Sequence, residues 1–344
     1  MIIWHKLWNI GIMRASLELF LNRNWYQDQK VPLWLRPLEW IYSLVSQQGR
    51  IPNATQQSTP VIVIGNLNVG GMGKTPLVVA LANKLLLQGA SVAIISKPYR
   101  VRKFHGYHLL SLNDDSSLYG DEACMMRKQT NASIYVTFNR QRTIEQISSL
   151  YDLILVDDGL QDIHLKRSFN ICVVDANKQF GTGHLLPAGP LRSSKYWMKH
   201  VDSICVRGQS NNLPAYHLEI QGFFELTDVN QHLIHDLPKK SIRVMTGIAH
   251  PDKLYQSLKP YNIQYEKTQF VDHHRWSQKD FYHIDEDTII VSEKDAVKIN
   301  FPVDKTILVA KTQLIMNTFL LELFNHLHRL YLDRKERSSE ANTH

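Results

Sequence analysis

The stretch between residues 61 and 76 constrains the fold more than any other part of the chain. Four consecutive apolar residues, 61–64, run into a glycine-rich segment that ends in Gly73, Lys74 and Thr75 at the start of a helix-forming run. A buried strand, a glycine turn and a helix in this order point backbone N–H groups at a phosphate on the helix N-terminus. Units of this kind belong to parallel sheets covered by helices, so the sequence predicts an α/β fold.

The glycine-rich segment predicts where a nucleotide would bind. Lys74 would reach the β- and γ-phosphates of ATP, and the hydroxyl of Thr75 would bind Mg²⁺. The generic pattern asks for glycine where Asn68 stands, so the match is imperfect, and a glycine turn without nucleotide is the alternative. The strand–helix context favours the nucleotide. We assign nucleotide binding to Asn68, Val69, Gly70, Gly71, Met72, Gly73, Lys74, Thr75 and Gln161.

A second apolar run, 153–156, ends in the carboxylates of Asp157 and Asp158. Parallel strands end at one edge of their sheet, so these carboxylates are expected beside the phosphate loop. Many strands end in Asp merely because Asp favours turns. In combination with Lys74 and Thr75, however, the pair indicates a magnesium site formed by Thr75, Asp157 and Asp158.

Apolar runs along the rest of the chain predict its organisation. Further strands are expected at 92–96 and 171–174, and polar–apolar alternation at 216–227 predicts antiparallel connecting strands. A second strand series at 243–246, 288–291 and 306–310 precedes a closing amphipathic helix at about 312–332. We therefore expect an α/β/α sandwich like that of P-loop NTPases, together with a second, smaller α/β domain. The expected segments are a helical arm (1–50), a P-loop domain (51–212), a β linker (213–240), the second domain (241–332) and a disordered tail (333–344).

The first fifty residues differ in composition from the rest. They hold five of the seven tryptophans and six Lys or Arg against three Asp or Glu. Helices are expected at about 3–22 and 35–47. Because Trp, Lys and Arg favour the headgroup layer, this arm is predicted to lie on a membrane surface, and packing on the protein body is the alternative. The predicted apolar stripe consists of Trp4, Leu7, Trp8, Leu17, Phe20 and Leu21, edged by Lys6, Arg14 and Arg23.

Charge and composition limit the partners and the compartment. The net charge of +7 suits an anionic membrane or a phosphorylated substrate. Nucleic acid is disfavoured, because no basic tract with interleaved aromatics occurs in the body of the chain. No apolar run approaches the roughly 18 residues of a membrane span, and no secretory signal is expected. Three widely separated cysteines fit a reducing compartment.

Several motifs in a fixed order carry a family resemblance. They are Gly120-Asp121-Glu122, Asp157-Asp158-Gly159-Leu160-Gln161, Leu186-Pro187-Ala188-Gly189-Pro190-Leu191-Arg192, Gly247-Ile248-Ala249-His250-Pro251, Asp272-His273-His274 and residues 292–298. With the phosphate loop, this set resembles the tetraacyldisaccharide 4'-kinase family of lipid A biosynthesis across roughly residues 30–330.

The resemblance implies an activity and a location. The reaction would be transfer of the γ-phosphate of ATP to the 4'-hydroxyl of a tetraacyldisaccharide 1-phosphate, which forms lipid IVA. The enzyme would be peripheral to the cytoplasmic face of a bacterial inner membrane, with ATP and Mg²⁺ as cofactors. No nucleic acid and no obligate protein partner are expected.

The resemblance also implies catalytic roles. Asp121 matches the family's catalytic aspartate and His273 its supporting histidine, because a carboxylate can take the proton of the acceptor hydroxyl while an imidazole orients it. We add Lys74 to these as a catalytic residue. From the residues alone, Asp121 could instead cap the helix that starts at Glu122, and His273 could be an ordinary histidine.

Four residues are assigned to substrate binding. The arginines would bind phosphate in bidentate fashion, with surface salt bridges as the alternative. Pro98 and Ser193 depart from the family pattern, which leaves the neighbouring roles open, and residues 292–298 have no assigned role. The four substrate residues are Lys97, Tyr99, Arg142 and Arg192.

Two other classes of protein remain as alternatives. One is a nucleotide switch of the partitioning-ATPase or metallochaperone type. Against it, Val69 stands where partitioning ATPases carry a second lysine, and the cysteines are dispersed. The other is a membrane scaffold that keeps a nucleotide fold without turnover.

Overall fold

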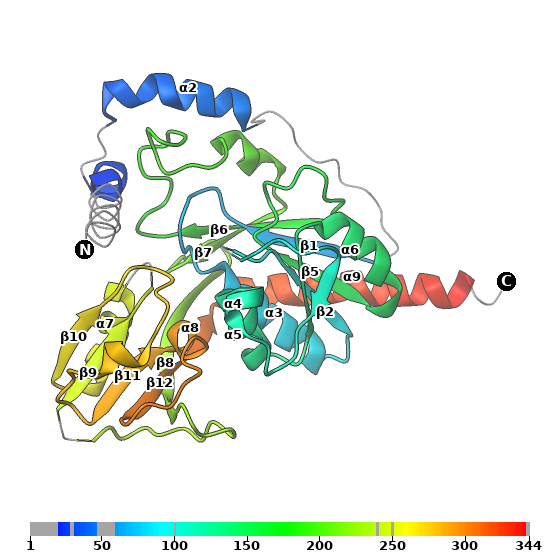
Figure 1. Ribbon diagram of the computed structural model, residues 1–344. Helices are drawn as coiled ribbons and strands as arrows, with labels where there is room; N and C mark the ends of the chain where they lie inside the picture. Colours follow the sequence, from blue (N-terminus) through cyan, green and yellow to red (C-terminus); the bar gives the residue numbers. More distant parts are fainter. Residues whose placement is uncertain are drawn as a thin grey trace.

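A computed structural model describes most of the chain as one α/β structure (Figure 1). Its described residues are 20–27, 31–46, 59–99, 101–238, 241–248 and 251–341. Within these ranges, twelve strands form a single sheet in the order β10-β9-β11-β12-β8-β7-β6-β1-β5-β2-β4-β3. The predicted α/β class is confirmed.

The first half of the sheet holds the phosphate loop. Strand β1 (Val61–Gly65) lies between β5 (Leu153–Asp157) and β6 (Phe169–Asp175), and all three are parallel. The outer strands are β2 (Val92–Ser96), β4 (Ser133–Thr137) and β7 (Ser203–Arg207), which are also parallel, and the antiparallel edge strand β3 (Tyr107–Leu109). The phosphate loop therefore starts from the middle of the sheet.

Helices cover both faces of this half, which explains why its central strands are apolar throughout. Ile62 and Ile64 of β1 pack with α3 (Lys74–Leu87), α5 (Asp121–Gln129) and α9 (Thr318–Ala341). On the opposite face, Val61 and Val63 pack with α6 (Arg140–Ile147) and the 3-10 helix η4 (Lys195–His200). Alternate side chains of β1 thus pack into two separate hydrophobic cores.

The second half contains β9 (Ile242–Thr246), β10 (Tyr265–Gln269) and β11 (Thr288–Ser292), all parallel. Helix α7 (Pro251–Leu258) covers one face, and an aromatic cluster with Trp276 and Phe281 covers the other. The short helix α8 (Glu293–Ala296) follows β11 directly and lies beside α5 of the first half. This contact brings the two halves together near the carboxyl ends of their strands.

Two long strands join the halves into one sheet. Strand β8 (Ala215–Glu225) pairs with β7 at its start and then runs antiparallel to β12 (Thr306–Met316). We expected β12 to end at 310 and a helix to begin at about 312, which is wrong. Residues 312–316 continue the strand because β8 supplies a partner for each of them.

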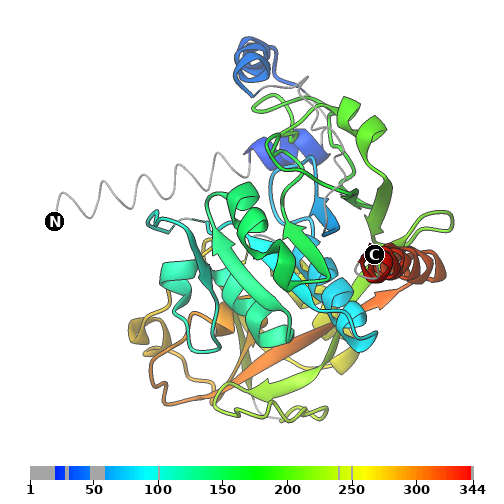
Figure 2. The ribbon, with the colours of Figure 1, turned by 90° about the vertical axis from the view of Figure 1, so that its right-hand side faces the viewer.

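Helix α9 closes the fold from a later start than expected. It begins at Thr318, where the Asn317 side chain accepts a hydrogen bond from the Leu320 amide at 3.0 Å. Its residues Leu320, Phe324 and Leu327 pack into the core of the first half. The helix continues to Ala341, whereas a disordered tail was expected from 333. Figure 2 shows α9 beside the sheet, far from helix α2.

The described part of the N-terminal arm ends in α2 (Arg36–Val45), preceded by the short π-helical and 3-10 turns η1 (Arg23–Gln27) and η2 (Leu33–Leu35). In Figure 1, α2 stands outside the sheet, over the loop that follows β6. The Tyr42 hydroxyl donates to the Arg192 carbonyl at 3.1 Å, and Glu39 Oε1 accepts from the Leu185 amide at 2.8 Å. Most of the predicted stripe at 4–21 lies outside the described residues. Among the residues described, no helix is long and apolar enough to cross a bilayer.

Candidate active site

The candidate site is a cavity between the two halves of the sheet. Its volume is about 2150 Å³, and it is lined by the phosphate loop, the ends of β5 and β6, the loop before His273 and helix α8. Single small ligands usually occupy no more than about 1000 Å³. The cavity therefore has room for a nucleotide and part of a second substrate.

The phosphate loop is held open by its glycines and by Asn66. Gly70 and Gly73 adopt φ angles of 92° and 84°, which residues with a Cβ rarely adopt. A Cβ on Gly73 would also lie 2.7 Å from the Arg207 side chain. Lys74 Nζ donates to Asn66 Oδ1 at 2.8 Å and lies 3.3 Å from Asp158 Oδ1. The lysine is thus fixed at the mouth of the loop, where a phosphate would meet it.

The predicted nucleotide residues face two directions. Residues 69–75 and Gln161 line the cavity. Asn68 does not: it is buried, and its amide donates to the Gln179 carbonyl at 2.9 Å and the Tyr26 hydroxyl at 3.2 Å. Gln161 supports the loop by donating to the Asn66 carbonyl at 2.7 Å. Asn68 therefore ties the loop to the chain beneath it, and its contact with nucleotide stays a prediction.

The surroundings of Asp157 show whether the site suits a metal ion. The Thr75 hydroxyl donates to Asp157 Oδ2 at 3.4 Å, while Oδ1 is buried and has no hydrogen-bond partner among the described residues. Burial raises the pKa of Asp157 to about 7. A buried carboxylate with an unpaired oxygen is what a hard cation would satisfy. The described residues contain no cluster of three His, Cys, Asp or Glu able to hold a metal.

Asp158 is already paired. Its two oxygens accept from Arg192 at 3.0 and 2.8 Å, and its backbone has a φ of 52°. Burial would raise the pKa of Asp158, but Lys74 and Arg192 outweigh burial and hold it well below the ordinary value. Arg192 also donates to Asn66 Oδ1 at 2.7 Å. Arg192 thus braces the phosphate loop, and its binding of substrate stays a prediction.

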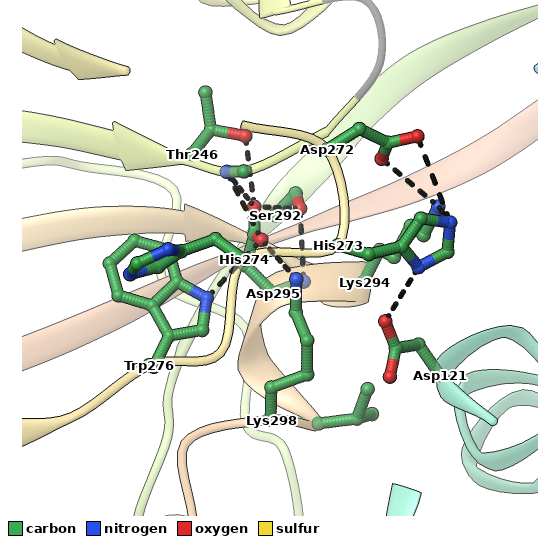
Figure 3. Close-up of polar contacts among 12 residues, drawn as sticks. Asp121, Thr246, Asp272, His273, His274, Trp276, Ser292, Lys294, Asp295 and Lys298 are labelled. Atoms are coloured by element: carbon green, nitrogen blue, oxygen red, sulfur yellow. Dashed lines mark hydrogen bonds and ion pairs between the residues drawn. The ribbon is translucent and has the colours of Figure 1, made fainter. Parts of the chain in front are cut away.

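Asp121 and His273 lie side by side (Figure 3), and of the two, His273 lines the cavity. His273 Nδ1 lies 2.9 Å from Asp121 Oδ2, although the residues belong to different halves of the sheet. Burial would raise the pKa of Asp121, but the hydrogen bond from His273 and the charges of Lys298 and Lys294 lower it. Asp121 does not cap α5: it is the first residue of that helix, and Gly120 holds the cap position without a side-chain bond.

The remaining predicted substrate residues, Lys97, Tyr99 and Arg142, line the same cavity. The Tyr99 ring lies 5.3 Å from that of His273. Sequence reasoning missed several charged residues here. Lys253 Nζ from α7 pairs with Asp175 Oδ2 of β6 at 2.8 Å and so links the halves. Of the missed residues, Glu122, Asp272 and Lys294 carried a signal, because they stand in the ordered motifs. The missed residues on the cavity wall are Glu122, Arg140, Asp175, Arg207, Lys253, Asp272 and Lys294.

The phosphate loop, its Thr–Asp pair and the carboxylate–imidazole pair at the cavity wall define a P-loop protein equipped for phosphoryl transfer. Comparisons with known proteins specify the family. The model of the tetraacyldisaccharide-1-P 4'-kinase family matches residues 31–328. The chain belongs to this family, and the resemblance of its motifs is confirmed.

Individual relatives agree with the family match. The tetraacyldisaccharide 4'-kinase of Legionella pneumophila (strain Corby) is 33% identical over 297 residues, covering 84% of this chain and 91% of its own. The enzyme of the same name from Francisella philomiragia is 33% identical over 302 residues, covering 81% and 94%. A crystal structure of LpxK from Aquifex aeolicus in complex with ATP has a TM-score of 0.69 at 22% identity, covering 86% and 98%. It shares the fold.

Proposed function

We propose that the protein transfers the γ-phosphate of ATP to the 4'-hydroxyl of a tetraacyldisaccharide 1-phosphate and so forms lipid IVA. The observation that supports this most is the Asp121–His273 contact of 2.9 Å, in which His273 lines the same cavity as the phosphate loop and Asp121 lies directly against it. A nucleotide switch would not need an acid–base pair that joins its two halves beside the nucleotide cavity. A scaffold without turnover would not need one either.

The residues divide the chemistry between them. Lys74 and the loop amides bind the β- and γ-phosphates and offset the charge that develops during transfer. His273 holds Oδ2 of Asp121, which leaves Oδ1 to take the proton of the 4'-hydroxyl as the oxygen attacks phosphorus. Because the Asp121 carboxyl has a lowered pKa, it is ionised at neutral pH and ready to act as a base.

Thr75 and Asp157 are the residues that would hold Mg²⁺, since they adjoin the loop and Asp157 has the unpaired oxygen. A bound Mg²⁺ would neutralise charge on the transferring phosphoryl group. Asp158 would not bind Mg²⁺ directly, because Lys74 and Arg192 already contact its oxygens. Its role would be to fix these two cations beside the phosphates.

Helix α2 supports binding to a membrane surface. Its exposed apolar side chains include Leu38, Ile41, Leu44 and Val45, between 47% and 75% exposed, while Glu39 and Tyr42 bond to the protein below. A surface helix in water normally turns its apolar side chains toward the protein and its polar side chains toward solvent. An outward apolar face is typical of interfacial helices. We infer that α2 lies on the cytoplasmic face of the inner membrane, where a lipid would present its sugar head to the cavity.

The test is phosphate transfer from γ-labelled ATP to a tetraacyldisaccharide 1-phosphate in detergent micelles. The expected result is labelled lipid from the wild type, little from Asp121→Asn, and full transfer by Asp285→Asn, a matched variant of an exposed carboxylate in the second half. ATP hydrolysis without labelled lipid would contradict the proposal.

A further inference from the structure

Residues 292–294 line the cavity without belonging to the phosphate loop, and polar side chains of residues 292–298 bind several other elements. Ser292 caps α8 by accepting from the Asp295 amide at 3.2 Å. Glu293 Oε2 accepts from the Thr312 amide and hydroxyl of β12 at 3.0 and 2.9 Å. The helix is therefore fixed to the strands on either side of it. A side chain that projects from α8 therefore has a fixed position.

Asp295 extends this anchoring to the loop that carries His273 (Figure 3). It is 0% exposed, and its carboxylate accepts from Thr246 Oγ1 at 2.8 Å, the Gly247 amide at 3.2 Å and Lys298 Nζ at 2.8 Å. The Gly247 carbonyl in turn accepts from the His273 amide at 3.1 Å. A buried charge is tolerated only when it is satisfied in this way. Through Gly247, the backbone of His273 is tied to α8.

Lys294 points from this fixed helix at the imidazole. Its Nζ lies 3.5 Å from His273 Nε2, 3.3 Å from Glu122 Oε1 and 3.6 Å from Asp272 Oδ1. Burial would lower the pKa of Lys294, but Glu122 and Asp272 raise it above its ordinary value, so the group is an ammonium ion. An ammonium donates hydrogen bonds and accepts none.

Other charged and aromatic side chains also surround His273. Asp121 faces Nδ1 at 2.9 Å, and Asp272 Oδ2 lies 3.7 Å from Nε2. The ring of Tyr99 stacks obliquely on the imidazole, and the charge of Lys298 acts on Asp121. Two opposite charges therefore lie near Nε2: the carboxylate of Asp272 at 3.7 Å and the ammonium of Lys294, which is nearer, at 3.5 Å.

We propose, on the basis of the proposed function, that Lys294 is a positioning residue that keeps His273 neutral, with its one proton on Nδ1 and donated to Asp121. The ionised carboxylate can only accept, so Nδ1 carries the proton, and the ammonium at Nε2 faces a bare nitrogen. A doubly protonated ring would form a full ion pair with Asp121 and weaken it as a base. Lys294 thus opposes the formation of this ion pair at lower pH.

The experiment compares Lys294→Met, Lys294→Arg and Lys279→Met, an exposed lysine of the same half. Two-bond ¹H–¹⁵N NMR on the resting protein reports which ring nitrogen of His273 is protonated at each pH. In Lys294→Met the pH midpoint for the second proton should rise by about one pH unit, because a nearby positive charge is lost. Lys294→Arg and Lys279→Met should keep the wild-type midpoint. An unmoved midpoint in Lys294→Met would overturn the proposal.

Asp272→Asn supplies a test of opposite sign if Lys294→Met fails to fold. Removing this carboxylate should lower the same midpoint, and a midpoint that stays or rises would also overturn the proposal. Kinetics complete the test: the acid limb of kcat/KM should move upward with the midpoint in Lys294→Met, while the KM for ATP is unchanged. A moved midpoint with an unmoved acid limb would contradict the role of Asp121 as the base. The proposed function could thus fail separately from the Lys294–His273 interaction.

Discussion

Replacing Asp121 with Asn tests whether the carboxylate and the imidazole act as one unit. The amide keeps the size of the side chain and removes its ability to take a proton. General-base assistance is typically worth about 10² to 10⁴ in rate, or roughly 3–5 kcal/mol of transition-state free energy. Because Asp121 contacts His273 rather than the phosphate loop, ATP affinity should change little.

The assay measures kcat and KM for lipid and for ATP in micelles, with ATP binding followed separately by calorimetry. His273→Ala should lower kcat by about tenfold or more, since it frees the carboxylate to rotate. If the 2.9 Å contact is the route by which His273 acts, the double variant should be scarcely slower than Asp121→Asn alone. Losses that multiply in the double variant would refute the coupling. A wild-type rate for Asp121→Asn would refute the base itself.

Three further predictions concern other parts of the structure. Lys74→Ala should lose most turnover, because the phosphates lose a cation fixed 2.8 Å from Asn66, and full activity in the transfer assay would count against the loop assignment. Burial would raise the pKa of Asp175, but Lys253 lowers it, so the ion pair stabilises the fold above about pH 4 and this contribution is lost as pH falls through the lowered pKa. Melting temperatures of wild type and Asp175→Asn should therefore differ at neutral pH and converge in acid, whereas a constant difference would exclude this cause. Exchanging Ile41 and Leu44 for Asp should weaken flotation with anionic vesicles at an unchanged melting temperature, since both side chains are exposed. Undiminished flotation would exclude α2 as a membrane contact.

The parts of the fold predicted from sequence are those that local chemistry determines. The strand before the phosphate loop is apolar because it is buried on both faces, and the same holds for β5, so both could be located from composition. Residues 312–316 were predicted wrongly because a polar–apolar mixture of this length suits a helix or a strand equally. Pairing with β8, almost a hundred residues earlier, decided the outcome.

Contacts between distant residues were harder to predict. No periodicity relates Asp121 to His273, and only the family motifs suggested that they act together. The position of Lys294 depends on the buried bonds of Asp295 to Thr246 and Gly247 in another strand, which the motif of residues 292–298 does not reveal. For Asn68, the position in the loop could be predicted from the sequence. The direction of its side chain could not, because it depends on contacts with Tyr26 and Gln179.

Locating the transferred phosphate tests the central claim most directly. Wild-type protein, ATP and Mg²⁺ are incubated with a tetraacyldisaccharide 1-phosphate, and the lipid product is examined by ³¹P NMR with proton correlation. The account predicts a second phosphomonoester whose phosphorus couples to the proton at the 4' carbon, formed in step with ADP and greatly slowed by Asp121→Asn. A phosphate at any other position, or ADP release with the lipid unchanged, would contradict it.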